Sequence, residues 1–375
     1  MKIILDSQAF NYQKYGGVSR YYTEIFSVLS RNPDVEVFIP WFYTKNIYYK
    51  ESVLYNSRQK KHNFFLELLS KLGISIRKKS KKSNYARTIN EGLSESNYDL
   101  FIPTYYDPYF LDYIDNKPFV LTVYDMIHEL FPQYFSDADK MAANKLLLIE
   151  KATKIIAVSQ NTKNDILRIY PHIEEEKIEV VYHGTSIKIN ENISTDLPSD
   201  YILFVGSRAD YKNFIFLVDA IKELLKKDSN LYLVCAGGGN FSKAENDFIK
   251  EMGLENQIIQ KDFEEEELGS FYKNAKCFVF PSLYEGFGIP VLESMACGCP
   301  VVLGNHSSFP EVAGKAGVYF DVNSKEDLKI KINNLLENEA LRVDFTAKGL
   351  EQSKKFNWEN AASQCLAVYQ KALKK

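Results

Sequence analysis

Short apolar runs alternate along this chain with longer stretches in which apolar residues recur at helical spacing. The apolar runs predict strands at 3–5, 35–40, 100–103, 119–125, 154–159, 177–184, 201–206, 231–237, 257–263, 277–281 and 300–304. The helical spacing predicts helices at about 18–29, 213–227 and 289–297. Uninterrupted apolar strands separated by helices are typical of parallel sheets covered on both faces, so the pattern predicts an α/β protein.

The length of the chain and a polar break in its pattern predict two domains. At 375 residues the chain is too long for one ordinary hydrophobic core. The stretch 186–200 has few apolar residues and contains Pro198, which is typical of a linker. We therefore expect two Rossmann-like parallel-sheet domains, 1–185 and 201–355, that face each other across a cleft. Ligands of such folds bind at the carboxyl ends of the strands, which makes the cleft the expected site.

The strongest candidate for chemistry is the stretch "EGFGIPVLESMACG" at 285–298. Pro290 suits the first turn of a helix and Gly298 suits the position just past its end, so a glycine loop leads into a short helix. Gly286 and Gly288 leave backbone N–H groups unshielded at the positive end of the helix dipole. Such an arrangement favours binding of an oxyanion or a hydroxyl.

Two glutamates flank this glycine loop, Glu285 on the loop itself and Glu293 about one turn into the helix. We expect them to contact different parts of one extended ligand, because their placement differs from a glycosidase pair that works across one bond. The stretch resembles the E-x7-E signature of retaining glycosyltransferases of family 4, which have the GT-B fold.

The resemblance extends over most of the chain, since further blocks of the family occur in the expected order. These blocks are "YILFVGSRADYKNF" at 201–214, "LVCAGGG" at 233–239, "DFEEEELGSFYKNAKCFVFPS" at 262–282, "NHSSFPEVAGKAGVYFD" at 305–321 and "FNWENAA" at 356–362. The closing block implies a C-terminal helix at 356–375 that crosses back to the first domain.

The resemblance implies that the donor is a sugar linked to a nucleoside diphosphate. Arg208 and Lys212 occupy the positions of the family's cations, which stabilise the negative charge on the diphosphate as the glycosidic C–O bond breaks. Glu285 is implied to hold the transferred sugar, and Glu293 the ribose diol. The implied donor-binding residues in this half are Gly286, Phe287, Gly288, Leu292, Glu293 and Phe263, the last of them beside the nucleobase.

In the first domain, Gly16 and Gly17 match the family's glycine loop near the diphosphate and the acceptor. The segment "LTVYDMIHELFP" departs from the family pattern, because relatives often carry a histidine where this chain has Tyr124. Two alternatives follow from this departure. Either His128 contacts the sugar in place of the missing histidine, or Asp125 orients the sugar instead.

Residues 58–87 form a basic segment with ten Lys and Arg against one acid, Glu67, in a chain whose formal net charge is −3. Apolar residues lie among these cations at roughly helical spacing, which is typical of a segment on an anionic membrane surface. A solvated helix flank with a loop is the alternative. The membrane interpretation makes a lipid-linked saccharide the expected acceptor. No module for stacking nucleobases accompanies the segment, so we do not expect a nucleic-acid partner.

The remaining chemistry-bearing residues predict neither a bound metal nor a cofactor. The five cysteines are an odd number without metal-ligand spacing, which favours reduced thiols in the cytoplasm. Asp137 and Asp139 imitate a metal-binding D-x-D motif, but Ser136 or Asp137 suits an ordinary helix N-cap. The sequence contains neither a signal-peptide pattern nor an apolar run of 18 residues, so we expect no secretion signal and no membrane span.

Together these observations predict a retaining, metal-independent glycosyltransferase that moves a hexosyl unit to a saccharide acceptor in cell-surface polysaccharide biosynthesis. We expect it in the cytoplasm, peripheral on the inner face of the cytoplasmic membrane. Two alternatives are an epimerase of nucleotide sugars on the same fold and a non-catalytic nucleotide-sugar-binding subunit.

Overall fold

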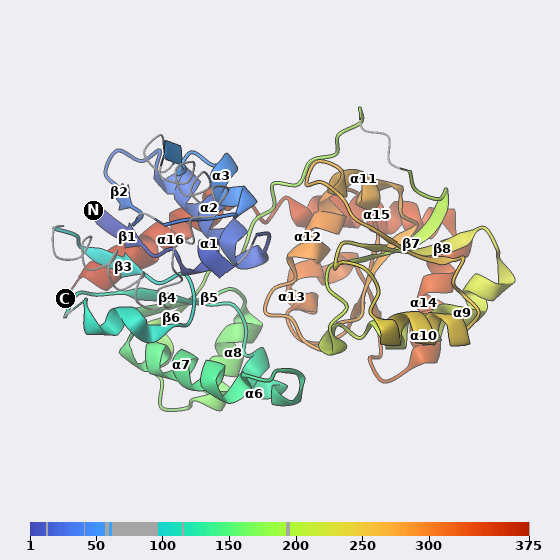
Figure 1. Ribbon diagram of the computed structural model, residues 1–375, viewed down its shortest axis with the longest axis horizontal. Helices are drawn as coiled ribbons and strands as arrows, with labels where there is room; N and C mark the ends of the chain where they lie inside the picture. The colour runs from blue at the N-terminus through green and yellow to red at the C-terminus, as the bar shows by residue number, and fades with distance from the viewer. Residues whose placement is uncertain are drawn as a thin grey trace, which may run out of the picture. The chain divides into compact units, whose positions relative to one another are not determined.

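The computed structural model describes residues 1–12, 14–40, 42–56, 60–61, 97–114, 116–192 and 196–374. The chain divides into two compact units (Figure 1). Unit 1 comprises Met1–His183 and Trp358–Lys375, and unit 2 comprises Gly184–Asn357. The predicted basic segment, apart from Lys60 and Lys61, lies outside the described residues.

Unit 1 is built on two parallel sheets, ordered β2-β1-β3 and β4-β5-β6. Its strands are β1 (Lys2–Leu5), β2 (Glu36–Phe38), β3 (Leu100–Ile102), β4 (Val120–Val123), β5 (Lys154–Ala157) and β6 (Ile178–Val180). A parallel bridge between Phe101 and Phe119 joins β3 to β4. The strand order reverses between β1 and β3, as in flavodoxin-like sheets.

Helices and short 3-10 turns connect these strands. They are α1 (Gln8–Tyr12), α2 (Gly17–Leu29), α3 (Ile47–Glu51), η1 (Pro108–Asp112), α6 (Ile127–Leu130), η2 (Pro132–Tyr134), α7 (Ala138–Lys151), α8 (Gln160–Ile169), η3 (Glu175–Lys177) and α16 (Trp358–Leu373). The C-terminal helix α16 packs on α2, where the rings of Phe26 and Tyr369 stack at 6.2 Å. The last helix of the chain therefore completes the core of the unit that contains the first strand.

Unit 2 contains one parallel sheet, ordered β12-β11-β10-β7-β8-β9. Its strands are β7 (Asp200–Val205), β8 (Leu231–Ala236), β9 (Ile258–Lys261), β10 (Cys277–Phe280), β11 (Val301–Gly304) and β12 (Gly317–Phe320). Counted within the unit, this order is 3-2-1-4-5-6, the order of dinucleotide-binding Rossmann sheets. The order reverses between β7 and β10, and ligands of such sheets bind beyond the carboxyl ends of the strands at that point.

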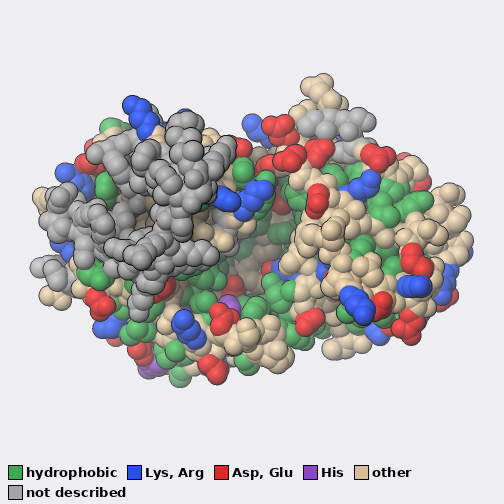
Figure 2. All heavy atoms as spheres, in the orientation of Figure 1, with side chains coloured by type: hydrophobic (Ala, Val, Ile, Leu, Met, Phe, Trp, Pro, Cys, Tyr) green, Lys and Arg blue, Asp and Glu red, His purple; other side chains and the backbone are tan. Residues whose placement is uncertain are grey.

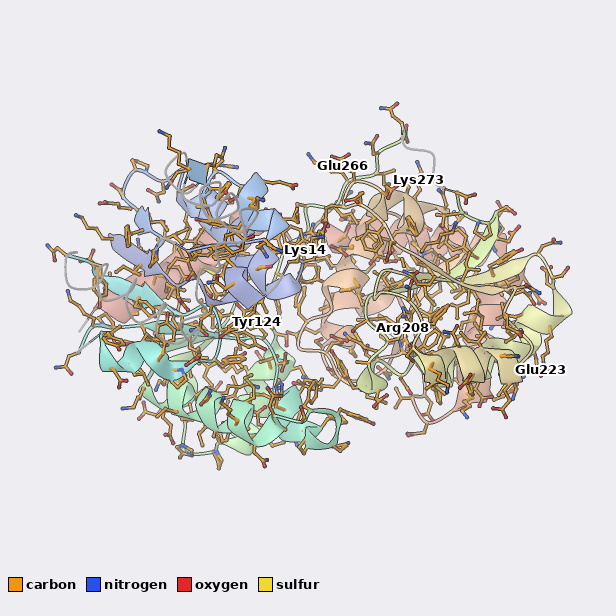
Figure 3. The ribbon with its side chains drawn as sticks, viewed as in Figure 1. Lys14, Tyr124, Arg208, Glu223, Glu266 and Lys273 are labelled. Carbon is orange, nitrogen blue, oxygen red and sulfur yellow. The ribbon has the colours of Figure 1, made fainter. Side chains whose placement is uncertain are left out.

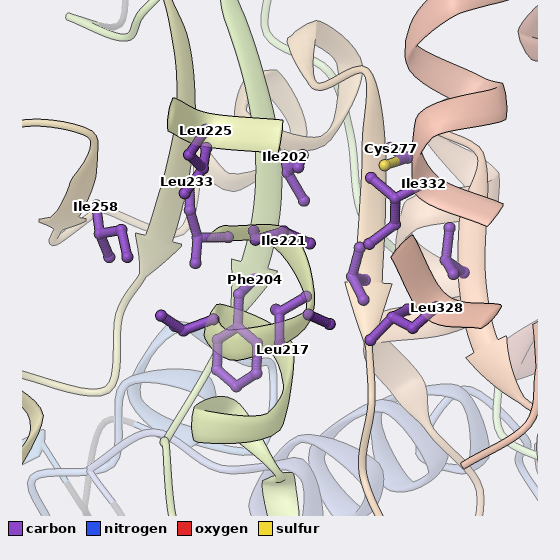
Figure 4. Packing of buried hydrophobic residues seen from close by; sticks show 14 of the residues in the cluster. Ile202, Phe204, Leu217, Ile221, Leu225, Leu233, Ile258, Cys277, Leu328 and Ile332 are labelled. Carbon is purple, nitrogen blue, oxygen red and sulfur yellow. The ribbon is translucent and has the colours of Figure 1, made fainter. Parts of the chain in front are cut away.

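Helices and two 3-10 turns connect the strands of unit 2. They are η4 (Asp210–Lys212), α9 (Phe214–Lys227), α10 (Lys243–Glu251), α11 (Leu268–Asn274), α12 (Ile289–Ala296), α13 (Phe309–Ala313), η5 (Gly314–Ala316), α14 (Lys325–Glu337) and α15 (Glu339–Ser353). Phe204 of β7 packs with Leu217 and Ile221 of α9 in the buried cluster between sheet and helices (Figure 4). Apolar residues at helical spacing on α9 thus explain how this helix covers the sheet.

The predicted α/β architecture with two Rossmann-like parallel-sheet domains is confirmed, and a strand lies within each predicted strand range or one residue beyond it. Strand β12 falls in the block 305–321 and was not predicted, because its four residues include a glycine and a tyrosine rather than a continuous aliphatic run. The predicted linker, residues 186–200, is part of unit 2 in the structure. Ser270 Oγ of α11 donates to the carbonyl of Asn190, and Lys273 pairs with Glu191.

Acidic and basic side chains intermingle on the face of the molecule that Figure 2 shows. Among the described residues, the helices are all too short or too polar to cross a bilayer.

Candidate functional site

The loops that follow β7 and β10 carry three of the predicted catalytic residues, Arg208, Lys212 and Glu285. These two strands are neighbours at the point where the strand order of unit 2 reverses. Because both strands run parallel, their following loops lie at the same edge of the sheet. The structure therefore brings residues 73 positions apart in the chain, Lys212 and Glu285, into contact at the place where this topology binds ligands.

Lys212 and Glu285 form a short ion pair, in which Lys212 Nζ donates to Glu285 Oε1 at 2.5 Å. Both side chains are 15% exposed, so the pair is largely shielded and still reachable. The ammonium also lies over the rings of Tyr211 and Phe280, at 5.0 and 4.9 Å from their centroids. Burial alone would lower the pKa of Lys212, but the carboxylate of Glu285 and Tyr211 raise it above the ordinary value. Lys212 is consequently a fixed cation at neutral pH.

Arg208, labelled in Figure 3, forms hydrogen bonds with other groups of unit 2. Its Nε donates to Glu245 Oε1 at 2.8 Å, and its two terminal nitrogens donate to the carbonyls of Gly237, Gly239 and Asn240. The guanidinium also lies 4.7 Å from the ring centroid of Phe241, and the side chain is 3% exposed. Arg208 thus clamps the glycine turn that follows β8.

That glycine turn requires glycines for a physical reason. Gly237, Gly238 and Gly239 have φ between +70° and +74°, a region that L side chains rarely adopt. A Cβ at Gly238 would also lie 2.3 Å from the carbonyl oxygen of Gly206. A Cβ at Gly237 would lie 3.0 Å from the ring of Phe263, so this predicted nucleobase neighbour lies against the turn.

The loop from Glu285 into α12 has the predicted form. Gly288 caps the helix with φ +91°, and Pro290 occupies its first turn. Phe287 is buried, with its ring 5.8 Å from that of Phe356. Gly286 lies between Glu285 and Phe287 on this loop.

The other two predicted residues of this segment are buried in α12. Leu292 is fully buried and apolar. Of these two residues, Glu293 is therefore the one with a polar group that could bind a ligand. Glu293 is 3% exposed, and Tyr272 OH of α11 donates to its Oε2 at 3.4 Å. Burial raises the pKa of Tyr272, and the nearby Glu293 raises it further.

Two family models together cover most of the chain. The model for group 1 glycosyl transferases matches residues 186–352, and the model for glycosyltransferase family 4 matches residues 15–188. The chain belongs to glycosyltransferase family 4.

Curated relatives of this family-4 chain include transferases and proteins without an assigned substrate. The O-antigen chain mannosyltransferase B of Escherichia coli is 30% identical over 241 residues, which is 59% of this chain and 61% of that protein. An uncharacterized glycosyltransferase of Methanocaldococcus jannaschii is 33% identical over 220 residues, or 58% of this chain and 59% of that protein. The alignments thus span about three fifths of the length of these relatives.

Solved structures of the GT-B fold match nearly the entire family-4 chain. The sucrose-phosphate synthase of Thermosynechococcus elongatus has a TM-score of 0.73 at 19% identity, covering 99% of this chain and 98% of that one. HepE of Anabaena, solved in complex with UDP and glucose, has a TM-score of 0.70 at 17% identity, covering 99% and 100%. At these identities the likeness shows the fold, and it confirms the predicted GT-B class.

In unit 1, the predicted glycines follow β1. Gly16 precedes α2, and its carbonyl accepts hydrogen bonds from Arg20 N and Ser19 Oγ, both at 3.0 Å. Its φ of 167° is extended backbone that any residue adopts, so the strand-to-helix turn itself does not demand glycine there. Gly17 is the first residue of α2.

Tyr124, at the position where the family resemblance implies a histidine, is buried in the core of unit 1 (Figure 3). Its ring lies 5.8 Å from that of Tyr21 and 6.3 Å from those of Tyr22 and Tyr106. Tyr124 therefore contributes packing, and any polar role in this segment belongs to the residues after it.

Asp125 and His128 follow β4 and lie beside a buried lysine that the sequence did not single out. Lys145 of α7 is fully buried and donates to the carbonyl of Asp125 and to Glu129 Oε2, both at 2.9 Å. His128 packs on Phe135 at 4.5 Å, and its pKa is lowered by burial and by the Lys145 cation. His128 is consequently neutral at pH 7.

The sequence analysis did not single out Lys145, Ser307 or Ser308. In the structure their side chains form hydrogen bonds with residues distant in the chain, Lys145 with Glu129, Ser307 with Glu285 and Ser308 with Phe287. A lysine inside the otherwise amphipathic stretch 138–151 was the one available signal.

Among the described residues, no group of three His, Cys, Asp or Glu side chains lies close enough together to hold a metal ion. Asp137 is the N-cap of α7, without a capping hydrogen bond from its side chain, and Asp139 lies in the first turn of that helix.

Proposed function

We propose that this chain is a retaining, metal-independent glycosyltransferase that moves a hexosyl unit from a nucleoside-diphosphate sugar to a saccharide acceptor. The Lys212–Glu285 pair at the strand-order reversal of unit 2 is the observation that carries the proposal. It supplies a cation for the diphosphate and a carboxylate for sugar hydroxyls at one point of the ligand-binding edge.

Charge development in the reaction explains why the fixed cation is needed. The bond between the anomeric carbon and the phosphate oxygen breaks, and negative charge grows on the departing diphosphate. A cation that is already positioned and shielded stabilises this charge without reorganisation. On donor binding, the diphosphate takes over the ammonium of Lys212, and Glu285 turns its carboxylate to the hydroxyls of the sugar.

Arg208 acts in this proposal beside the glycine turn, where it adds positive charge near the diphosphate. Glu293 binds the ribose hydroxyls, and Phe263 lies beside the base. The acceptor hydroxyl attacks from the face that the diphosphate leaves, forms the new C–O bond, and passes its proton to a departing phosphate oxygen. This route retains the configuration at the anomeric carbon and needs no side-chain base.

Mannose is the hexose to test first, and a surface polysaccharide intermediate is the acceptor class proposed.

 The O-antigen relative named above is a mannosyltransferase, and so is the O-antigen chain mannosyltransferase RfbU of Salmonella typhimurium, 26% identical over 233 residues. A lipid-linked saccharide on the inner face of the cytoplasmic membrane is the acceptor that fits such a role, with the basic segment 58–87 holding the protein at that surface.

A thermal-shift panel tests the proposal. Purified protein is heated with GDP, UDP, ADP, CMP or dTDP, and with GDP-mannose or UDP-glucose, each with and without EDTA. A ligand at about 100 times its dissociation constant adds roughly 2.7 kcal/mol to the free energy of unfolding, which shifts the midpoint visibly. Stabilisation by one diphosphate and its sugar, with or without EDTA, supports the proposal. Absence of any shift contradicts it, and a shift that EDTA abolishes contradicts metal independence.

A further inference from the structure

The loop that carries Glu285 is held in place by the segment that follows β11. Ser307 Oγ donates to the carbonyl of Glu285 at 2.5 Å and accepts from the backbone N–H of Glu285 at 3.0 Å. Ser308 Oγ lies 2.9 Å from the carbonyl of Glu285 and 3.0 Å from that of Phe287. The two serines thus hold both backbone groups of Glu285 and the carbonyl two residues later.

His306 extends this support to the start of the same loop. Its Nε2 lies 3.1 Å from the carbonyl of Ser282 and 2.8 Å from that of Leu283. Two carbonyl partners require Nε2 to carry the proton and donate. Burial lowers the pKa of His306, so the neutral ring persists at pH 7.

The direction of these carbonyls also sets the direction of two amides. The described peptide bonds are trans, and in a trans peptide the C=O and the following N–H point in opposite directions. The carbonyls of Glu285 and Phe287 point to the serines. The N–H groups of Gly286 and Gly288 therefore point away from the serines, on the opposite side of the loop.

The backbone of Ser307 is strained, and Ser308 is completely buried. Ser307 has φ +57°, a region that few residues other than glycine, asparagine and aspartate adopt. Such strain persists where the surrounding structure demands it, and it is concentrated at functional sites. Ser308 is 0% exposed, so its hydroxyl serves the loop rather than solvent.

We infer that Ser307 and Ser308 are positioning residues for the sugar part of the donor. The inference rests on the proposed function, in which the carboxylate of Glu285 binds the hydroxyls of that sugar. By holding the backbone of Glu285, the serines place its carboxylate beside Lys212 and direct the loop amides. They do not touch Lys212, Arg208 or Glu293 in the contacts described above, so they act on the sugar and not on the nucleotide.

Binding measurements on the full chain test this inference. Dissociation constants are measured by calorimetry for GDP and GDP-mannose, and for UDP and UDP-glucose, with the wild type and with Ser307→Gly and Ser308→Ala. Glycine tolerates φ +57°, so Ser307→Gly removes the hydroxyl without adding backbone strain. We expect a loss of about tenfold or more in affinity for the sugar nucleotide, because small displacements of positioning groups have large effects. Affinity for the matching diphosphate stays within about twofold.

Ser294→Ala is the matched control. Ser294 is also 0% exposed, and its Oγ also donates to a backbone carbonyl, that of Cys299 at 3.2 Å, at the far end of α12. We expect this variant to melt at a lower temperature and to keep the wild-type ratio of the two dissociation constants.

The outcomes separate this inference from the proposed function. A wild type that binds none of the four nucleotides contradicts the proposed function. A wild type that binds a sugar nucleotide, with an unchanged ratio of dissociation constants in Ser307→Gly and Ser308→Ala, overturns the positioning role alone. Equal weakening of diphosphate and sugar nucleotide also overturns it. If Ser308→Ala fails to fold, the half-buried Ser307→Gly decides the question.

Discussion

The ammonium of Lys212 illustrates how one side chain acquires a role from its surroundings. The side chain is 15% exposed, and its ammonium lies over two aromatic rings and is paired with Glu285. Since the carboxylate keeps the pKa of Lys212 raised despite burial, the side chain remains a cation over the whole physiological pH range. A diphosphate therefore meets a charge that is already in place.

Replacing Lys212 with alanine should lower the rate of sugar transfer by about 10²- to 10³-fold, the usual effect of removing one group that stabilises transition-state charge. The measurement is release of nucleoside diphosphate from the donor in the presence of acceptor. Lys222→Ala is the control, because Lys222 forms a partly buried ion pair with Asp219 on α9. Transfer by a folded Lys212→Ala protein at the wild-type rate would remove Lys212 from the mechanism.

His183 makes a different contribution, to the pH dependence of stability. It is buried between the rings of Tyr21 and Trp358, at 4.9 and 5.9 Å, and burial lowers its pKa from 6.5 to about 3. Between these values the unfolded chain binds a proton that the folded chain does not. Stability from this group is therefore present above pH 6.5 and is lost as the pH falls towards 3.

Replacing His183 with phenylalanine should remove this part of the acid sensitivity. We expect the difference in unfolding free energy between wild type and His183→Phe to change by up to about 1.4 kcal/mol per pH unit below pH 6.5. Denaturant melts at pH 7, 6 and 5 measure the difference. The comparison is needed because Asp6, whose pKa burial raises to about 6, acts in the opposite direction. The same change in a variant of the exposed His172 would contradict the assignment.

Among the elements, the glycine turn after β8 shows how local backbone geometry and packing combine. Gly238 and Gly239 both have φ +74°. A Cβ at Gly238 would collide with the carbonyl oxygen of Gly206, whereas a Cβ at Gly239 would meet nothing within 4 Å. Both positions thus favour glycine because of the left-handed backbone, and Gly238 also needs glycine because a side chain would have no room there.

Alanine at Gly239 should destabilise the protein by about 1–2 kcal/mol, the usual cost of a left-handed conformation. Alanine at Gly238 should cost clearly more, because the turn must also move away from β7. Thermal melting of the two variants measures the difference. Equal melting midpoints would contradict this prediction, because they would show that the turn can move away from the carbonyl oxygen of Gly206 without a loss of stability.

The chain as a whole crosses twice between its two units, after His183 and before Trp358. The rings of these two residues contact each other inside unit 1. Helix α16, which begins at Trp358, buries seven side chains, Trp358, Ala361, Ala362, Cys365, Val368, Tyr369 and Ala372. The stability of unit 1 therefore depends on the side chains that α16 buries.

Ending the chain at Asn357 should unfold unit 1. Burial of a large apolar side chain is worth about 1.5–3 kcal/mol, so Trp358, Val368 and Tyr369 together approach the typical stability of a domain. Limited proteolysis should cut the truncated protein within Met1–His183 and leave Gly184–Asn357 intact. A chain that ends at Leu373 is the control, and equal resistance of both proteins would contradict this dependence.

The strands and the glycine loop were predictable from the sequence because their signals are local. A continuous apolar run such as 201–206 becomes a strand whichever neighbours it finds, and Pro290 and Gly298 mark the ends of α12 by their own backbone preferences. The prediction of Lys212 and Glu285 also needed the family resemblance, because their separation of 73 residues hides the contact.

Other features were decided by the tertiary structure, because they depend on which groups meet and how deeply they are buried. Tyr124 became a core residue because three tyrosine rings surround it, and Arg208 became a clamp because the turn after β8 presents its carbonyls. Ser307 and Ser308 carry no sequence signal. Only the parallel pairing of β10 with β11 brings their hydroxyls to the backbone of Glu285.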